Sequence, residues 1–321
     1  MPRPKRSVSL ITCARLPETD PDAELLVDCL AAAGLDAHWT AWDELDGAGV
    51  LASYPAGVPP VGFLRSTWNY AHHLEAFLGW CDAFPGRLTN SATLVRWNSH
   101  KRYLLDLAGV GIATVPTAVV TRGQHEALDG LATRFGTADL VVKPAVSAGS
   151  FRTFRSRGRI ADIEGEYAAL VRDRDTLVQP YVPTVDQDYG ERALVVLGGI
   201  VTHAVRKSPR FSGDHERVTR VEVTDEEAEF ARRVLAAVPA MGAFEAPVYA
   251  RVDVTRLPTG GGNGSEGPGR LAVMELELIE PSLFLAQSTE GLWRFVELVE
   301  QAVRAASGER GRRASAQEEE P

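Results

Sequence analysis

An apolar stretch near the end of the chain, LAVMELELIEPSLFL (residues 271–285), carries two glutamates that lie only two residues apart. Side chains of a strand alternate between its two faces, so Glu275 and Glu277 share one face and Leu276 occupies the other. A carboxylate in an apolar setting is costly unless a positive group holds it. The pair therefore faces either solvent, on a half-exposed strand, or a metal ion. Glu280 breaks the alternation and is expected on the surface or in a loop.

A third acid joins the pair if the preceding strand folds back on it. In YARVDVTRL (residues 249–257), Arg251, Asp253 and Thr255 share one strand face. Antiparallel pairing of the two strands would bring the Asp253 carboxylate beside the two glutamates. Three oxygen ligands on rigid strands suit Mg²⁺, which keeps waters and substrate phosphates in its remaining positions.

The segment between these strands, PTGGGNGSEGPGR, contains a literal G-x-G-x-x-G at Gly262, Gly264 and Gly267. A dinucleotide-binding fingerprint of this kind follows a strand and opens a helix. Here a second strand follows instead, so we interpret the segment as a hairpin loop.

Strands and helices alternate in the first part of the chain, which indicates a parallel α/β layer there. Strands are expected at 8–12, 36–41, 61–67, 115–120, 140–144, 149–154, 176–182, 248–257 and 270–279, with a hairpin over 192–208 that turns at Gly198 and Gly199. Helices are expected at 22–33, 72–84, 91–109 with a break near Asn98, 123–135, 161–172, 224–238 and 289–306. The charged tail from residue 307 is expected to be disordered.

Composition excludes several classes of protein. A net charge of −9 over 321 residues argues against a nucleic-acid surface, which needs a basic face. The basic start MPRPKR is followed by an apolar run too short for a signal peptide, and no stretch reaches the length of a membrane helix. Cys13, Cys29 and Cys81 show no metal-type or paired spacing, which suits a reducing compartment. We therefore expect a cytoplasmic protein.

Two lysines and one strand are candidates for nucleotide contacts. Lys143 ends an apolar strand, and the small-residue loop after it, with Ser147 and Ser150, can offer N–H and hydroxyl groups to phosphates. Lys101 lies in the helix after the expected break. The strand LVQPYVP can present its backbone along a nucleotide edge. Taken singly, each lysine is equally consistent with a surface position and the strand with an ordinary β-strand.

In their order along the chain, these pieces resemble the ATP-grasp superfamily, in particular its glutathione-synthetase and ribosomal-protein-modifying ligase branch. The resemblance covers roughly residues 60–300 and is carried by WNSHKRYLL, VVKPAVSAGSFRTF, LVQPYV, GERALVVLGG, THAVRKS, ARVDV and MELELIEPS. It implies an α/β (α+β) ATP-grasp fold. The expected parts are an N-terminal parallel α/β domain (1–95), a linker helix with a small subdomain (96–180), a large subdomain with the metal site (181–306) and the tail (307–321).

The resemblance also implies a role for each matching residue. Lys101, Lys143, Ser147 and Ser150 would contact the phosphates of ATP. The adenine would be framed by Gln179, Tyr181 and Val182, and the ribose would meet Asp186. Arg192 and Arg206 would neutralise the γ-phosphate or acyl-phosphate oxygens, and Asp253, Glu275 and Glu277 would hold one or two Mg²⁺, which Mn²⁺ could replace. Pro180 stands where relatives often have an acid, and it removes one backbone donor from the adenine edge.

The implied activity is that of a carboxylate–amine ligase. A carboxylate attacks the γ-phosphate of ATP, and an amine displaces phosphate from the resulting acyl phosphate, with positioning and charge neutralisation as the main catalytic effects. Two alternatives remain open on the same scaffold: a small-molecule kinase, and a nucleotide-binding regulator without catalysis. Retention of all three acids argues against the regulator.

The substrate signal lies in FLRSTWNYAHH (residues 63–73), after a strand of the N-terminal layer. Arg65 could clamp a carboxylate with two hydrogen bonds, or could instead form a structural ion pair beside a tryptophan-anchored turn. The R-S-T-W-N-Y string resembles that of the ATP-grasp ligases that close the ring in D-cycloserine biosynthesis and act on O-ureido-D-serine. The expected partners are small carboxylate and amine substrates, without nucleic acid or membrane, and relatives often form homodimers.

Overall fold

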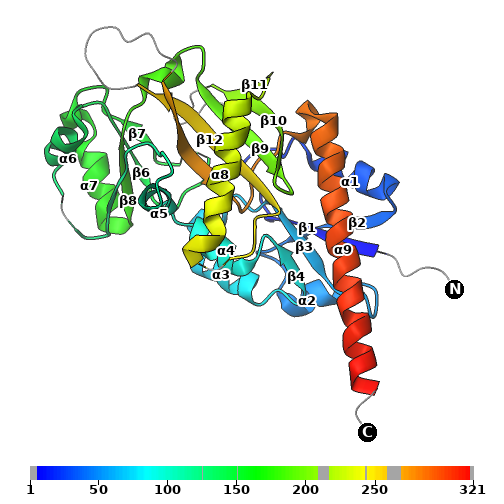
Figure 1. Cartoon of the computed structure of the whole chain (residues 1–321). Coiled ribbons are helices and arrows are strands. Elements are labelled where there is room, and N and C mark those ends of the chain that lie inside the picture. Colours follow the sequence, from blue (N-terminus) through cyan, green and yellow to red (C-terminus); the bar gives the residue numbers. More distant parts are fainter. Residues whose placement is uncertain are drawn as a thin grey trace.

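The computed structural model describes residues 6–318, apart from His125, Ser150, Ala243 and the segments 209–216 and 259–268. Its strands form three sheets that follow one another along the chain, and helices cover them (Figure 1). The expected glycine-rich loop at 262–267 lies outside the described residues. No helix in the described part of the chain is long and apolar enough to cross a membrane.

The N-terminal sheet is parallel and has the strand order β2-β1-β3-β4. Each strand feeds a helix or a short loop that returns over the sheet, as a parallel layer requires. Its strands are β1 (Arg6–Thr12), β2 (Leu35–Ala41), β3 (Val61–Ser66) and β4 (Arg87–Thr89), and its helices are α1 (Ala23–Ala32), α2 (Gly47–Ala52), η1 (Tyr70–His72), α3 (Leu74–Asp82) and α4 (Ala92–Asn98). β3 is buried along its whole length, which fits a strand covered on both faces.

A second, smaller sheet has the order β5-β8-β6-β7. Its apolar face packs on two helices around Leu131, Leu140 and Leu170. Its elements are β5 (Ala118–Val120), α6 (Leu128–Phe135), β6 (Leu140–Pro144), β7 (Phe154–Arg155), η2 (Ile160–Asp162), α7 (Glu164–Asp173), β8 (Thr176–Pro180) and η3 (Pro183–Asp186), and α5 (Tyr103–Gly109) leads into it.

The third sheet is antiparallel, with the order β11-β10-β9-β12-β13. Its first hairpin turns at Gly198 and Gly199, whose φ angles of 60° and 80° are open to glycine at little cost. Its elements are β9 (Glu191–Leu197), β10 (Ile200–Lys207), β11 (Val218–Val221), α8 (Asp225–Gly242), β12 (Tyr249–Leu257), β13 (Arg270–Glu277), η4 (Leu285–Gln287) and α9 (Thr289–Glu318).

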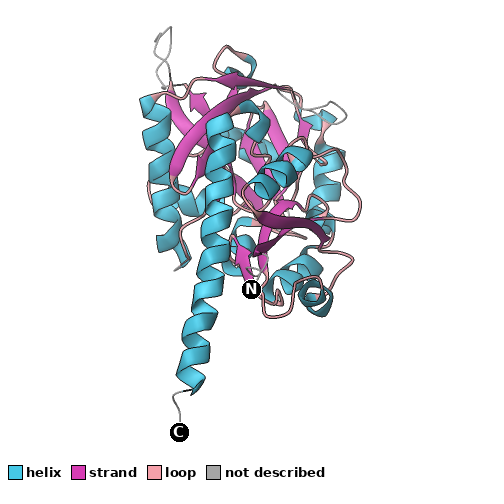
Figure 2. Cartoon of the chain, turned by 90° about the vertical axis from the view of Figure 1, so that its right-hand side faces the viewer, coloured by secondary structure: helices cyan, strands magenta, loops and turns pink. Residues whose placement is uncertain are grey.

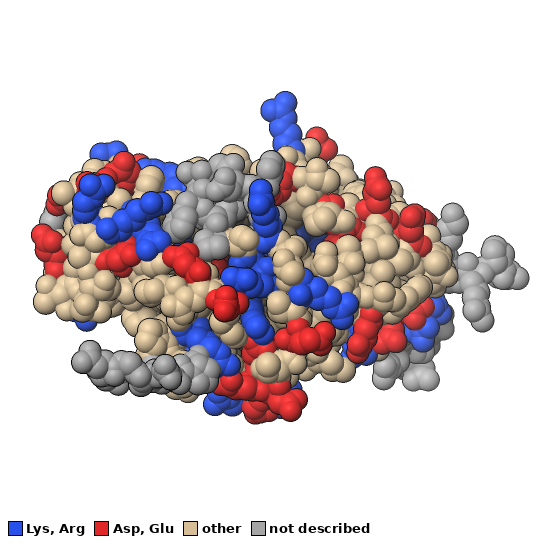
Figure 3. Space-filling view, turned by 90° about the horizontal axis from the view of Figure 1, so that it is seen from above, with Lys and Arg blue, Asp and Glu red and all other residues tan. Residues whose placement is uncertain are grey.

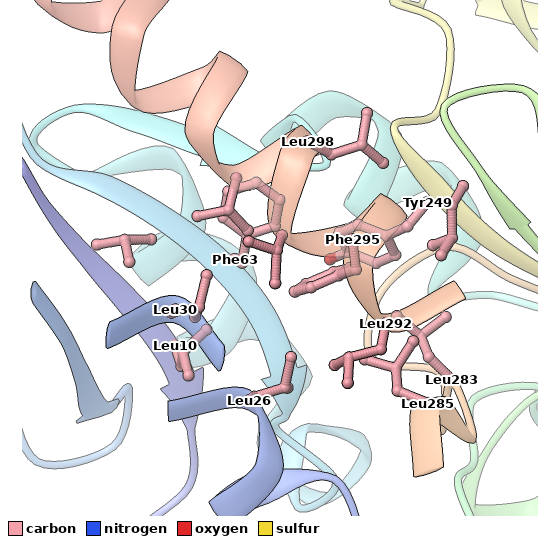
Figure 4. Packing of buried hydrophobic residues seen from close by; sticks show 14 of the residues in the cluster. Leu10, Leu26, Leu30, Phe63, Tyr249, Leu283, Leu285, Leu292, Phe295 and Leu298 are labelled. Carbon is pink, nitrogen blue, oxygen red and sulfur yellow. The ribbon is translucent and has the colours of Figure 1, made fainter. Parts of the chain in front are cut away.

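A continuous hydrophobic cluster joins the N-terminal sheet to the third sheet. Phe63 of β3 stacks on Tyr249 of β12 and meets the ring of Phe295 of α9 edge-on, at centroid separations of 6.3 and 5.6 Å (Figure 4). Leu26 and Leu30 of α1 complete this layer. The third sheet is therefore joined to the N-terminal layer through a packed core.

Polar side chains fasten the same joint. The buried hydroxyl of Tyr249 lies 2.8 to 3.0 Å from the backbone carbonyls of Leu64, Thr89 and Ile279, which belong to three different segments. Burial raises the pKa of this phenol far above its ordinary value, so the hydroxyl is a donor at any physiological pH. Asn90 donates to the carbonyl of Tyr249 as well, at 3.0 Å.

Two expectations for local structure are wrong. The segment 149–154 is a turn, and only Phe154–Arg155 form a strand, because glycine and small polar residues leave nothing to bury on either face. The last helix does not end near residue 306 but continues to Glu318, as an extension that leaves the body of the molecule (Figure 2). The Ala, Arg, Glu and Gln residues of this tail all have high helix propensity, which the charged composition obscures.

The surface seen in Figure 3 mixes charges of both signs. Lys and Arg side chains on this face are interspersed with Asp and Glu rather than gathered into a basic field.

Candidate active site

A cleft of about 440 Å³ opens where the three sheets meet. Its walls come from the loops after β1 and β3, from β6 and the loop that follows it, from the end of β8, and from β10, β12 and β13. Sites at the junction of several domains are the usual place for a ligand cleft. All the candidate residues can be placed relative to this one cavity.

Three carboxylates converge at the cleft: Glu275 and Glu277 line it, and Asp253 is fully buried beside them. Asp253 of β12 stands directly opposite Glu275 of β13, and the next cross-strand pair on the same face is Arg251 with Glu277. Ligand oxygens of the three acids all lie within 4.8 Å of one another. The sequence predicts this convergence, and the antiparallel pairing of β12 with β13 produces it. Such a cluster is an all-oxygen donor set of the kind that Mg²⁺ favours.

Cationic side chains hold the acids in place. Arg251 donates to Asp253 at 2.8 and 2.9 Å and to Glu277 at 2.5 Å. Lys207 of β10 pairs with Asp253 at 2.6 Å and with Glu191 of β9 at 2.5 Å. The cluster is thus a compensated network rather than a set of bare charges, as a buried site requires.

The pKa values of the acids diverge because of these neighbours. Burial alone would raise the pKa of Glu275, but Lys101, Lys143 and Lys207 outweigh it and lower that pKa below its ordinary range. Burial raises the pKa of Glu277 to about 8, in spite of Arg251, and the charges of Glu275 and Asp253 raise it further. The site therefore favours a cation that would relieve the repulsion among its carboxylates.

The outer edge of β13 pairs with the backbone of residues 113–115 at Val273, and side chains hold it beyond that point. Asn98, at the end of α4, donates to the carbonyl of Leu276 at 2.9 Å and accepts from the N–H of Leu278 at 2.8 Å. The hydroxyl oxygen of Tyr103 accepts a hydrogen bond from the N–H of Leu276 at 3.1 Å. These contacts satisfy buried backbone groups and set which face of the strand points into the cleft.

Both expected lysines line the cleft. Lys101 contacts Glu275 at 3.0 Å and donates to the carbonyl of Ser147 at 2.7 Å, which ties the linker to the loop after β6. Lys143 stands on β6, where burial lowers its pKa, the ammonium of Lys101 lowers it further and Glu275 opposes the shift. Ser147 lines the cleft as expected, and Ser150 lies outside the described residues.

The opposite end of the cleft is apolar. Val115, Val182, Val185 and Met274 pack together there, with Leu257 beside them. Gln179 and Tyr181 also line this end, so the hinge strand borders the cleft where the sequence places the adenine. Flat apolar walls beside a strand edge suit a purine ring.

Asp186 does not line the cleft, contrary to the expected ribose contact. The 3₁₀ turn η3 points Val185 inward and leaves the Asp186 carboxylate half exposed, 3.8 Å from the guanidinium of Arg155. Arg155 lies over the ring of Tyr181 and also pairs with Asp139 at 2.7 Å. Asp186 thus belongs to a surface network behind the hinge.

Arg65 is likewise outside the cleft. Its side chain is 1% exposed, donates to the carbonyl of Pro281 at 3.3 Å, stands 3.9 Å from Asp22 and lies over the ring of Phe295. This position fits the structural alternative for Arg65, because the guanidinium is buried in the joint between the domains, where its Nε has no hydrogen-bond partner among the described residues.

Arg192 and Arg206 point to the other face of the third sheet. They are cross-strand neighbours, as are Glu191 and Lys207, and adjacent pairs on a strand face opposite sides. Arg192 pairs at 3.0 Å with Glu227 of α8, which is fully buried, and Arg206 donates to the carbonyl of Gln187 at 2.8 Å. The phosphate-neutralising role expected for them is not compatible with these positions.

The cationic groups of the cleft that the sequence reasoning missed are Lys207 and Arg251. Arg251 could have been predicted from the sequence, because it shares a strand face with Asp253. Lys207 is adjacent to Arg206, and only the register of the hairpin decides between them. Glu280 is a further correction, because its side chain lines the cleft instead of lying on the surface.

Comparisons with known proteins agree with this geometry. A family model described as the N-terminal domain of D-cycloserine synthetase DcsG matches residues 8–90. The cycloserine biosynthesis protein DcsG of Streptomyces lavendulae is 31% identical over 305 residues, which cover 90% of this chain and 96% of that protein. The crystal structure of D-cycloserine synthetase DcsG has a TM-score of 0.78 and 30% identity, covering 92% of this chain and 99% of that one.

More distant structures share the fold alone. D-alanine–D-alanine ligase from Bacillus anthracis has a TM-score of 0.62 at 15% identity, covering 94% of this chain and 99% of that chain. The ATP-grasp ligase PsnB, in a complex with a minimal precursor, Mg and ADP, has a TM-score of 0.59 at 17% identity with the same coverage. The fold is therefore the ATP-grasp fold.

Proposed function

This chain belongs to the D-cycloserine synthetase family of ATP-grasp ligases, and we propose that it closes the ring of an O-substituted D-serine. The proposed substrate is O-ureido-D-serine, on which the ligases that its sequence resembles act. The substrate carboxylate attacks the γ-phosphate of ATP, and a nitrogen of the same molecule then displaces phosphate from the acyl phosphate. The observation that carries the proposal is the convergence of three carboxylates, two of which line the cleft, with four cationic side chains that line the same cleft.

Asp253, Glu275 and Glu277 fit a divalent cation, since their oxygens converge within 4.8 Å, and burial together with the charges of the other two acids raises the pKa of Glu277 to about 8. They would hold Mg²⁺, or Mn²⁺ in its place, which when bound neutralises phosphate oxygens during transfer. Arg251 would remain beside them, because each carboxylate oxygen has a further lone pair besides the one that accepts its N–H group.

Four cations would act on the phosphates and on the activated carboxylate. Lys101 and Lys143 stand on the side of the small sheet, next to the loop that begins at Ala145, and suit the phosphates of bound ATP. Lys207 and Arg251 project from the third sheet and suit the oxygens that gain charge as the acyl phosphate forms. A preorganised set of such groups stabilises charge that develops in the transition state.

The substrate end of the cleft is lined by Trp68, Tyr70 and His72 from the segment after β3, and by Phe151 from the loop after β6. The rings of His72 and Phe151 meet edge-on at 4.8 Å, so two domains close this end together. An enclosed aromatic chamber favours a small substrate over a long peptide. A small-molecule, ATP-consuming ligase of this kind belongs in the cytoplasm.

The test is release of ADP with O-ureido-D-serine, ATP and Mg²⁺, followed by mass-spectrometric detection of the cyclic product. Hydroxylamine added to the reaction should divert the acyl phosphate to a hydroxamate, which a kinase acting on an alcohol would not form. O-ureido-L-serine serves as the stereochemical control. Failure of every O-substituted serine to stimulate ADP release would overturn the proposal.

A further inference from the structure

Glu280 occupies a fixed position at the substrate end of the cleft. Its backbone carbonyl accepts a hydrogen bond from the indole of Trp68 at 3.2 Å. The next two carbonyls are taken in the same way, that of Pro281 by Arg65 at 3.3 Å and that of Ser282 by Arg251 at 3.4 Å. Side chains from three other segments thus hold three successive carbonyls. They fix the backbone at Glu280, which lines the cavity.

The carboxylate of Glu280 differs from the other acids of the third sheet. Glu275 is paired with Lys101, Glu277 with Arg251, and Asp253 with both Arg251 and Lys207. Within the described ranges, no other residue donates a hydrogen bond to the Glu280 carboxylate or forms an ion pair with it, and its own backbone N–H is its one donor. An acid that is largely withdrawn from water and lacks a partner is costly, which points to a ligand as its partner.

Glu280 is also distinct from the metal cluster. It follows Glu277 by three residues, beyond the end of β13, and is absent from the set of acids whose oxygens converge. Its charge acts on Tyr70 at the substrate end of the cleft. The pKa of Tyr70 is raised first by burial and next by the charge of Glu280. The carboxylate therefore faces the substrate rather than the cation.

The electrostatic setting keeps this acid able to exchange a proton near neutral pH. Burial raises the pKa of Glu280 to about 8, against the charges of Lys101 and Arg251, and the charge of Glu275 adds to the rise. The other titratable groups that feel its charge are Tyr70 of η1, Tyr249 of β12 and Cys81 of α3, all of which burial keeps protonated. A carboxylate whose pKa lies near the working pH can both accept and release a proton, as a general base must.

We propose that Glu280 is the catalytic base that accepts the proton of the attacking nitrogen in the second half of the reaction. This assignment rests on the ligase function proposed above. The nitrogen forms a bond to the acyl carbon, the bond from that carbon to the phosphate oxygen breaks, and phosphate leaves with its electron pair. The proton lost by the nitrogen moves to the Glu280 carboxylate and from there to solvent, so no further reactant is needed.

The two half-reactions can be measured separately in Glu280→Gln. Hydroxylamine is a strong nucleophile that needs no enzymic base, so hydroxamate formation and the accompanying ADP release should stay within about threefold of the unaltered protein. Ring closure on O-ureido-D-serine should fall by about 10²–10⁴-fold, the range that a general base contributes. Glu280→Asp, which keeps a carboxylate on a shorter arm, should recover part of this loss.

Glu44→Gln, at an exposed loop position, is the matched control for the change of charge and should leave both rates unchanged. The pH dependence gives a second readout: the rise of ring closure with pH should disappear in Glu280→Gln, whereas hydroxamate formation keeps its profile. Equal loss of both rates, or of neither, would exclude the role of Glu280 as base. An unaltered protein that yields neither ADP nor hydroxamate would instead overturn the ligase function and this assignment with it.

Discussion

Replacement of Asn98 by alanine tests how the acid strand is held. The side chain is 6% exposed and bonds to two backbone groups of β13, the carbonyl of Leu276 and the N–H of Leu278. β13 is the last strand of its sheet, so no neighbouring strand can take over these groups. A buried backbone group left unpaired costs about 1–3 kcal/mol. Water from the adjacent cleft can reach one of these two backbone groups. We therefore expect Asn98→Ala to lower the free energy of unfolding by about 3 kcal/mol.

The measurement is the free energy of unfolding from urea titration, combined with the affinity for ADP at fixed Mg²⁺. Freed from Asn98, the strand can rotate its acidic face, so ADP affinity should fall along with stability. Ser99→Ala is the matched control, because it removes a hydroxyl that bonds only within its own helix turn, to the carbonyl of Arg96. A change below about 1 kcal/mol with unaltered ADP affinity would refute the idea that Asn98 sets the strand.

Three further predictions follow from the same contacts. Glu275→Gln should lower Mg²⁺-dependent ADP release by at least about 10²-fold, and a Mg²⁺ titration should not restore it. Arg251→Gln should reduce turnover by about 10²–10³-fold. Arg192→Gln should keep turnover within about threefold but lower stability by about 3 kcal/mol, since it removes the cation paired with the buried Glu227 and leaves that carboxylate only its hydrogen bonds from Thr224 and Tyr189. Tyr249→Phe should cost about 1–3 kcal/mol in urea unfolding with little effect on turnover.

Much of the fold could be predicted because hydrophobic periodicity reports directly on burial. The run VGFLRST predicts a buried strand, and β3 is buried at every position. The convergence of Asp253 with the two glutamates also follows from a period of two and one hairpin. Positions decided by contacts between distant segments could not be predicted: Arg65 and Asp186 are used up by partners that no local pattern indicates.

The arginine in the first hairpin shows why a strand register cannot be counted from the turn. Ile200 pairs with Leu197 and Val201 with Val196, but His203 then pairs with Val195 because Thr202 is an extra residue. Without that bulge, Arg206 would stand opposite Glu191 on the cleft face. With the bulge, Lys207 stands opposite Glu191 instead. A shift of one residue thus exchanges the two faces of the strand.

A second bulge does the same for the acid strand, and it explains how one strand serves two ends of the cleft. Asp253 pairs with Glu275 and Val254 with Val273, so Met274 is the extra residue. Strict alternation would send Met274 and Glu275 to opposite faces, yet both line the cleft. Met274 completes the apolar end and Glu275 the metal cluster. The joining of the proposed purine and cation sites thus depends on one inserted residue. Deleting it should uncouple them by turning either residues 270–273 or the acids Glu275 and Glu277 to the opposite face.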